Sequence, residues 1–304
     1  MKTPVVLIIF KRADTTKIVC EEIRKANPSK LFIIADGPRT DKASESKKCI
    51  EARRVVEEIN WDCEVFRNYS DTNMGLRNRI ASGLDWVFSI VNSAIILEDD
   101  CLPDPTFFCF CDKILEIYEH DERVMSVTGT NILGEWKSDL QSYHYSNYFN
   151  SWGWATWKRV WDSYDVDMKL WSDPEVKSRV RDVIADKKQY LNRKRLFDLT
   201  HSGNTQSWAY QFFFMCLINS GLTITPSVNL VSNIGFSQDA TNTKFASSYL
   251  SAKPSLSMKF PLKKPLATAV DKEYDFRWYK QVWERSLGKR LEWKYHGLRK
   301  RLRI

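Results

Sequence analysis

The sequence predicts an α/β protein in which a mostly parallel β-sheet is flanked by helices. Over roughly the first hundred residues, short β-branched apolar runs alternate with longer segments whose apolar residues recur at helical spacing. The chain of 304 residues is also 43% hydrophobic, which is enough to bury a core in one large domain or two small ones. Strands and helices that alternate at this pace imply right-handed crossovers between parallel strands.

The first half predicts four strands and three helices in strict alternation. The strands are expected in residues 4–10, 30–37, 63–68 and 93–99, and the helices in residues 14–26, 41–59 and 75–91. The first helix should begin with Asp14 or Thr15 as its cap. Open parallel sheets bind ligands at the carboxyl ends of their strands, so residues 10–12, 35–37 and 98–100 should lie along one edge.

The second half has a different composition, which predicts a mixed arrangement. Its start is strongly aromatic, with four tryptophans close together at Trp152, Trp154, Trp157 and Trp161. A charged helical stretch follows near residues 170–200, and a buried helix then ends at Gly221. A strand and an irregular polar segment come next, before a C-terminal helical tail. No glycine-rich phosphate loop follows the first strand, where the chain reads FKRADTT.

Cysteine usage and the N-terminus exclude several protein classes. The seven cysteines form no paired CxxC pattern, so we expect reduced thiols in a cytosol and neither a disulfide scaffold nor a structural zinc site. The apolar run near the N-terminus, residues 5–10, is shorter than a secretory signal, and no stretch is long enough to span a membrane. We therefore expect a cytoplasmic protein.

Three adjacent acids at the end of the fourth strand, Glu98, Asp99 and Asp100, require a counter-charge. Two like charges about 4 Å apart cost on the order of 4 kcal/mol at an effective dielectric constant near 20. A Mn²⁺ or Mg²⁺ ion is the usual solution, bound by one or two carboxylates together with substrate phosphates and water. The simpler interpretation is a solvated acidic loop, and the position at the binding edge favours the metal.

Six motifs in register resemble one enzyme family. AIILEDDCLPDP looks like the DXD-type motif of GT-A glycosyltransferases, in particular the N-acetylglucosaminyltransferase I type and its bacterial hemolysin-like relatives. VVLIIFKRADTT, FIIADGPR, NMGLRNRIASGLDWVF, SWGWATWKRVWD and LTITPSVNLVSNIGFSQDAT are the other five. The resemblance covers residues 4 to about 245. It implies a GT-A, Rossmann-like fold, with a nucleotide-sugar-binding half in 1–105, an acceptor-side half in 106–250 and a basic, aromatic extension in 251–304.

The resemblance assigns a role to each acidic and basic residue at the predicted edge. It implies that Asp100 ligates Mn²⁺ and that the acids Glu98 and Asp99 lie near the metal and ribose of a UDP-sugar. The resemblance also implies that Arg12, Asp36 and Arg77 contact the nucleoside. Each of these three residues also has a purely structural interpretation. Arg12 and Arg77 could be solvated charges, and Asp36 could belong to a turn.

The catalytic base and the acceptor site are expected in the second half of the chain. The family's base is an aspartate beside a tryptophan, and the corresponding position here is Ala209. Asp239 is then the candidate base, or the reaction is retaining and needs no such base, or the protein binds without turnover. Trp152 and Trp154 flank Gly153 and are candidates to stack on acceptor sugars, although core tryptophans are the alternative, and the preferred one for Trp157 and Trp161. Residues 232–243 would form a lid.

The C-terminal tail carries most of the net charge of +8. Residues 277–304 hold ten Lys or Arg and two Glu, interleaved with tryptophan and leucine. This pattern suits a helix on the inner face of an anionic membrane, near a lipid-linked acceptor, and equally a helix packed on the domain. Nucleic-acid binding is disfavoured, because a nucleic-acid binder would spread its charge over the folded body.

The sequence therefore predicts a metal-dependent glycosyltransferase that uses a UDP-sugar in surface polysaccharide synthesis. A glycan or lipid-linked oligosaccharide would be the acceptor. The alternatives are a sugar nucleotidyltransferase and a non-catalytic nucleotide-sugar or glycan-binding module.

Overall fold

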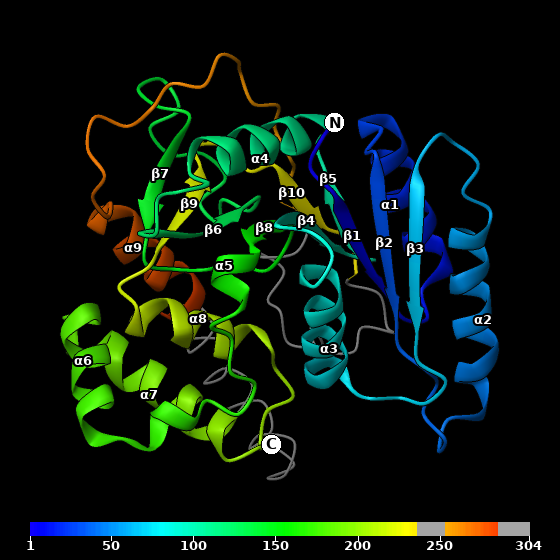
Figure 1. Cartoon of the computed structure of the whole chain (residues 1–304). Helices are drawn as coiled ribbons and strands as arrows, with labels where there is room; N and C mark the ends of the chain where they lie inside the picture. The colour runs from blue at the N-terminus through cyan, green and yellow to red at the C-terminus, as the bar shows by residue number, and fades with distance from the viewer. Residues whose placement is uncertain (236–252, 285–304) are drawn as a thin grey trace, which may run out of the picture.

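The computed structural model describes residues 1–235 and 253–284 (Figure 1). In these residues, eight strands form one sheet in the order β3-β2-β1-β4-β8-β6-β9-β7, and β10 pairs with β5 in a separate ribbon. Helices cover the sheet and extend beyond it at the side away from β3 (Figure 1). The predicted α/β class, with a mostly parallel sheet flanked by helices, is confirmed.

The first half is a parallel sheet with the predicted alternation. Its strands are β1 (Val5–Ile9), β2 (Lys30–Ala35), β3 (Glu64–Tyr69) and β4 (Ser93–Glu98), and each neighbouring pair is parallel. Its helices are α1 (Ala13–Ala26), α2 (Ala43–Glu57) and α3 (Leu76–Phe88). The chain builds outward from β1 to β3 and then returns to place β4 on the other side of β1. This reversal lies between β1 and β4, the point where open sheets bind ligands.

The first helix begins earlier than predicted, which corrects the assignment of Asp14 or Thr15 as its cap. Arg12 is the N-cap residue and makes no side-chain capping bond. Its carbonyl oxygen accepts hydrogen bonds from the backbone N–H of Thr16 at 3.0 Å and from the Thr16 hydroxyl at 2.6 Å. The Arg12 side chain lies instead at the site described below.

The second half joins the parallel sheet through β8. The strands β6 (Val124–Thr128), β7 (Tyr143–Ser146), β8 (Trp154–Trp157) and β9 (Leu222–Pro226) give a mixed sheet in which β8 runs antiparallel to both β4 and β6. The short strands β5 (Cys101–Pro103) and β10 (Val231–Asn233) pair above the end of β4. Helix α4 (Pro105–Ile117) follows β5, and the Asp104 side chain caps it by accepting from the Thr106 N–H.

The remaining helices gather at the far side of the sheet from β3 (Figure 1). They are α5 (Lys158–Trp161), a 3₁₀ turn at Lys169–Ser172, α6 (Pro174–Ile184), α7 (Lys187–His201), α8 (Ala209–Ile218), α9 (Lys272–Tyr279) and a π-helical turn at Lys280–Glu284. In the described part of the chain, no helix combines the length and the apolar character needed to cross a bilayer. Most of the basic tail, from residue 285 on, lies outside the described residues, so its predicted membrane contact stays a prediction.

The tryptophan-rich segment builds core rather than surface. Trp154 is 0% exposed and lies within 5.1 Å of Trp208 and 4.9 Å of Phe212, measured between ring centroids. Trp157 and Trp161 are also buried, in line with the preferred interpretation of both. The expectation that Trp154 stacks on an acceptor sugar is corrected, because its ring has no accessible face. The strand pattern places it on the side of β8 that packs against α8.

Candidate functional site

The carboxyl ends of β1, β2 and β4 open into a cleft of about 620 Å³. This donor cleft, as we name it, also reaches the start of α3 and the segment before α8. Of the predicted site residues, it brings together Arg12, Asp36, Glu98, Asp99, Asp100 and Trp152. It also includes residues that sequence reasoning missed, namely Arg39, Asn73, Arg79, Gln206, Ser207, Trp208 and Asn233.

Arg12 supplies a counter-charge to the acid triplet from within the chain. Its Nε donates to Asp99 Oδ1 at 3.0 Å, and its Nη1 lies 2.9 Å from Asp100 Oδ2. The Phe10 N–H donates to the other Asp99 oxygen at 3.2 Å. Burial lowers the pKa of Arg12, but the charges of Asp99 and Asp100 outweigh it and raise that pKa above its usual value. The arginine therefore stays charged and bridges two of the three acids.

Glu98 is the acid that Arg12 does not bridge. Burial and the charges of Asp100 and Asp99 raise the pKa of Glu98 above its ordinary value, and a side-chain hydrogen bond with Trp208 offsets part of the rise. Trp208 immediately precedes Ala209, the position where the resemblance expects a catalytic aspartate. The carboxylate that lies beside this part of the chain is therefore Glu98 on β4, and α8 supplies none.

The chain crosses directly over Asp100 just after β10. The Ile234 N–H donates to the Asp100 carbonyl oxygen at 2.8 Å. A Cβ atom on Gly235 would lie 2.1 Å from Asp100 Oδ2 and 2.7 Å from Arg12 Nη1, so only glycine fits at this position. Asp239 and residues 236–243 of the predicted lid lie outside the described residues.

Asp36 anchors the loop that leads into α3. Its carboxylate accepts from the N–H groups of Gly37 at 2.9 Å, Met74 at 2.8 Å and Gly75 at 3.1 Å, and from Asn73 Nδ2 at 3.0 Å. Four donors occupy the usual acceptor positions of a carboxylate. In this structure the side chain thus joins β2 to α3 across the bottom of the cleft.

Arg77 does not line the donor cleft, whereas Arg79 does. Arg79 is 4% exposed, and its guanidinium donates to the Ala35 carbonyl oxygen at 3.1 Å. Arg77 instead lies near Tyr164, where burial raises the tyrosine pKa and the arginine charge partly offsets the rise. Helical spacing carries the signal for this difference, because position 79 falls on the apolar face between Leu76 and Ile80.

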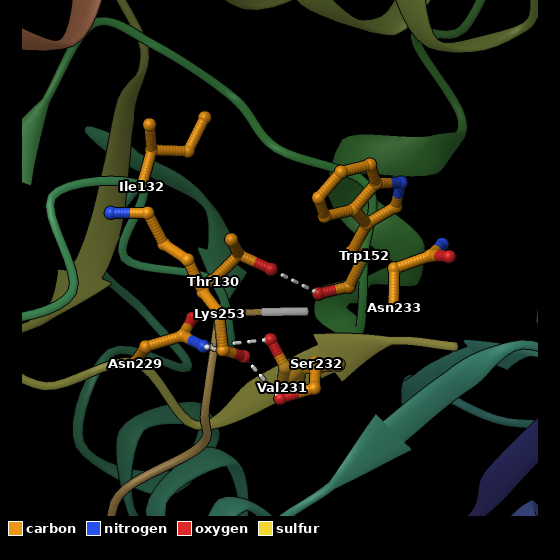
Figure 2. Close-up of a pocket in the computed structure, with 8 residues that line it drawn as sticks. All are labelled: Thr130, Ile132, Trp152, Asn229, Val231, Ser232, Asn233 and Lys253. Carbon is orange, nitrogen blue, oxygen red and sulfur yellow. Dashed lines mark hydrogen bonds between the residues drawn. The ribbon is translucent and has the colours of Figure 1, made fainter. Parts of the chain in front are cut away.

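Trp152 and Gly153 occupy the wall between the cleft and the β5–β10 ribbon. The Thr130 hydroxyl donates to the Trp152 carbonyl oxygen at 2.7 Å, in a small polar pocket shown in Figure 2. Gly153 has a φ of +63°, and a Cβ there would lie 2.6 Å from Val231 Cγ2. This glycine is needed for the packing of Val231, and its carbonyl oxygen accepts from the Gly129 N–H at 2.7 Å. Its expected place at an acceptor site stays a prediction.

The donor set determines which metal ion could fit. In residues 1–235 and 253–284, no three His, Cys, Asp or Glu side chains form a metal-binding group. The cleft is lined by four carboxylates and three arginines, so its acidic side chains outnumber its basic ones by one. This arrangement fits a Mg²⁺ or Mn²⁺ ion held by Asp100 and largely by phosphate oxygens. It does not fit a site built from protein ligands alone.

No protein-family model and no curated protein matches the sequence. Solved structures with a similar arrangement include a UTP-bound UGPase from Acinetobacter baumannii, 9% identical with a TM-score of 0.36 over 77% of this chain and 88% of that chain. A UDP-glucose pyrophosphorylase complexed with UDP-glucose is 8% identical, with a TM-score of 0.31 over 53% of this chain and 78% of that chain. A 4-diphosphocytidyl-2C-methyl-D-erythritol synthase from Anaerococcus prevotii is 9% identical, with a TM-score of 0.33 over 57% and 78%. Likenesses this low assign no reaction to this chain.

Proposed function

We propose that this protein is a glycosyltransferase that binds a nucleotide-sugar in the donor cleft and moves the sugar to a hydroxyl group of a glycan or lipid-linked acceptor. One observation carries the proposal. Arg12, Asp36 and the acids Glu98 to Asp100 line a single cleft at the switch point of the sheet. The six motifs that resemble GT-A enzymes supply the reaction class.

The diphosphate of the donor would lie at the Arg12–Asp99–Asp100 end of the cleft, and the nucleoside toward Asp36. Uridine is the base that the resemblance favours. The Asp36 carboxylate already accepts hydrogen bonds from four N–H groups. To recognise uracil, it would have to exchange one of these hydrogen bonds for one from the uracil N–H.

A Mn²⁺ or Mg²⁺ ion would be held by Asp100 together with the diphosphate oxygens. When bound, such an ion stabilises the charge on the departing diphosphate. Arg12 would orient the same group from the side of β1, because its guanidinium already lies against Asp100. Asp99, fixed by Arg12 and the Phe10 N–H, would hold that arginine in place.

The transfer forms one bond and breaks another. The acceptor oxygen bonds to the anomeric carbon, and the bond from that carbon to the diphosphate oxygen breaks. The electron pair leaves with the nucleoside diphosphate, and the hydroxyl proton passes to a base. Asp239 remains our proposed base for an inverting reaction; a retaining reaction needs no such base.

A sugar nucleotidyltransferase is the second candidate, and Ala209 is the observation that favours it. In that reaction a sugar phosphate oxygen attacks the α-phosphorus of a nucleoside triphosphate, and pyrophosphate leaves. A phosphate nucleophile is already deprotonated, so the absence of a carboxylate at position 209 costs nothing. The lack of a glycine-rich loop after β1 weighs against this candidate.

The deciding experiment uses the full chain, a panel of UDP-sugars and Mn²⁺, with chelator as the control. We expect one UDP-sugar to bind in calorimetry and to release UDP when an acceptor is added. Pyrophosphate release from UTP and a sugar 1-phosphate would assign the second candidate instead. Binding without release of either product would leave a nucleotide-sugar-binding module, and no binding of any uridine nucleotide would overturn the proposal.

A further inference from the structure

A second cavity of about 270 Å³ adjoins the donor cleft. The two share Ser151, Trp152 and Ala209 as lining residues. The second cavity is also lined by Ile132, Phe149 and Asn150 and by residues of α7, α8, α9 and the turn that follows. These helices lie together on the side of the sheet away from β3 (Figure 1). Its volume is close to the lower end, roughly 300 Å³, of small-molecule sites. We name it the aromatic cavity.

Five of its lining side chains are aromatic besides Trp152, and one is a buried cation. The aromatic ones are Phe149, Tyr210, Phe213, Trp278 and Trp283. The cation is Arg193 of α7, which is 5% exposed. Its guanidinium carbon lies 4.6 Å from the ring centroid of Phe213 and 5.2 Å from that of Trp278. Tyr148 and Trp283 complete a cage of four rings, at 5.0 and 5.4 Å.

Arg193 has no carboxylate partner within ion-pair distance among the described residues. Its Nε is buried and makes no hydrogen bond. Asp275 is near enough to act on it electrostatically, but that carboxylate accepts instead from the Ser146 hydroxyl and, at 3.0 Å, from the Asn147 N–H. The Tyr148 hydroxyl makes a side-chain hydrogen bond with Arg193, and Tyr210 and Tyr279 are near enough to act on it electrostatically.

A buried cation without a carboxylate is costly. Aromatic faces offset part of that cost through cation–π contacts, but they do not accept hydrogen bonds from the edge of the guanidinium. A guanidinium has five N–H donors that match two oxygens of a carboxylate or phosphate. An anionic ligand in the aromatic cavity would satisfy them.

We propose that the aromatic cavity binds the second substrate and that Arg193 selects one that carries an anionic group beside a sugar ring. The group is a carboxylate, as in a uronic acid, or a phosphate. The aromatic rings contact the sugar, and the shared wall at Trp152 and Ala209 places it next to the donor. This inference rests on the proposed function, since it names the class of acceptor for the same site.

The test compares three aryl glycosides that differ at one position. They are p-nitrophenyl β-glucuronide, the matching 6-phosphoglucoside and the neutral glucoside, titrated calorimetrically into the full chain saturated with UDP and Mn²⁺. We expect at least one charged probe to bind at least about tenfold more tightly than the neutral one. The probe that does so distinguishes a carboxylate from a phosphate source.

Arg193→Met should abolish that preference while UDP binding in the donor cleft is unchanged. Arg195→Met, on the exposed face of the same helix, is the matched control and should keep the preference. Equal binding of charged and neutral probes by the wild-type chain would overturn the inference, even where Arg193→Met fails to fold. A preference that survives in Arg193→Met would also overturn it. Loss of UDP binding by the wild-type chain would instead count against the proposed function.

Discussion

The two cavities each contain an arginine, half-buried in one and buried in the other, and they compensate its charge in opposite ways. Arg12 in the donor cleft lies between two carboxylates, whereas Arg193 in the aromatic cavity lies among four rings. The first site has more carboxylates than arginines, whereas the second has an arginine with no carboxylate within ion-pair distance among the described residues. The first site would therefore favour a cation and the second an anion. Two substrates of different chemistry would match this difference.

Replacing the arginine of the donor cleft should have the largest effect. Arg12→Met leaves Asp99 and Asp100 without a counter-charge, so we expect a loss of about 3 to 5 kcal/mol in the free energy of unfolding. Mn²⁺ should restore part of this stability. Chemical denaturation with and without Mn²⁺ measures both effects.

The control for this variant is Arg24→Met, since Arg24 forms an exposed pair with Glu21 on the same helix. It should change stability by less than about 1 kcal/mol. A loss for Arg12→Met no larger than that of the control would mean that the acid triplet does not depend on Arg12.

Replacing Asp100 tests whether the donor cleft binds a divalent cation. Asp100→Ala should weaken Mn²⁺-dependent UDP binding by at least about tenfold, because Asp100 is the proposed protein ligand of the ion. Calorimetry with Mn²⁺ and with chelator measures it, and circular dichroism checks the fold. Glu116→Ala, on the exposed face of α4, should leave binding as it is. Unchanged UDP affinity in Asp100→Ala would remove the metal from the proposal.

Replacing Asp36 separates two roles of this residue in the donor cleft, namely anchoring the loop before α3 and recognising the base. Asp36→Asn places an amide N–H among four N–H donors, so we expect about 1 to 3 kcal/mol less stability and weaker UDP binding. Asp41→Asn, an exposed aspartate on the same connection, is the control. Weaker binding with stability unchanged would show that Asp36 reads the base and does not mainly anchor the loop.

The arginine of the aromatic cavity should matter far less for stability. Arg193→Met removes a buried charge, which stabilises the fold, and removes its contacts with the rings, which destabilises it. We therefore expect the free energy of unfolding to change by no more than about 1 kcal/mol. Thermal unfolding of Arg193→Met beside Arg12→Met gives the comparison directly. A loss for Arg193→Met as large as that for Arg12→Met would mean that both arginines are structural.

The two halves should also differ in the sign of their pH dependence. Hydrogen bonding to Arg39 holds the pKa of Glu45, next to the donor cleft, at about 2, so its stabilising contribution is lost as the pH falls from about 4.5 toward 2. Burial raises the pKa of Asp275, next to the aromatic cavity, to about 7. The folded state therefore binds more protons than the unfolded state between about pH 4 and 7, and stability falls as the pH rises through that window.

Asp275→Asn should thus raise stability at pH 8 relative to the wild type and give no gain at pH 4. Glu45→Gln should lower stability at pH 7 and have little effect at pH 2. Unfolding curves of both variants across this range measure the two slopes. Equal slopes in Asp275→Asn and the wild type between pH 4 and 7 would contradict the assignment.

The parallel half of the fold could be predicted because its signals are local. The buried strand Val5–Ile9 and the amphipathic helix Ala13–Ala26 each follow from the residues they contain. The edge that collects Arg12, Asp36 and the acid triplet follows from the parallel arrangement. What sequence reasoning could not supply was side-chain pairing: that Arg12 reaches the acids of β4, and that Asp36 is engaged by the loop before α3.

The aromatic half resisted prediction because its contacts are distant in sequence. Trp152 and Trp154 look equivalent in the chain, yet Trp154 is buried in β8, whereas Trp152, which precedes the strand, lines the donor cleft. Arg193 belongs to a stretch whose sequence predicts only a charged helix, and the rings that surround it come from other segments of the chain. Helical spacing could have distinguished Arg79 from Arg77, whereas no local pattern indicates the cage around Arg193.

The position of β8 in the sheet has a consequence for synthesis on the ribosome. Strand β4 carries the acid triplet at its end, but one edge of it stays unpaired until residues 154–157 emerge and insert beside it. A nascent chain that has completed the parallel half therefore exposes, for a time, an apolar strand edge whose backbone N–H and C=O groups are unpaired. The loop closure between β4 and β8 should then set the pace of folding, and the nascent parallel half is where a chaperone would be expected to act.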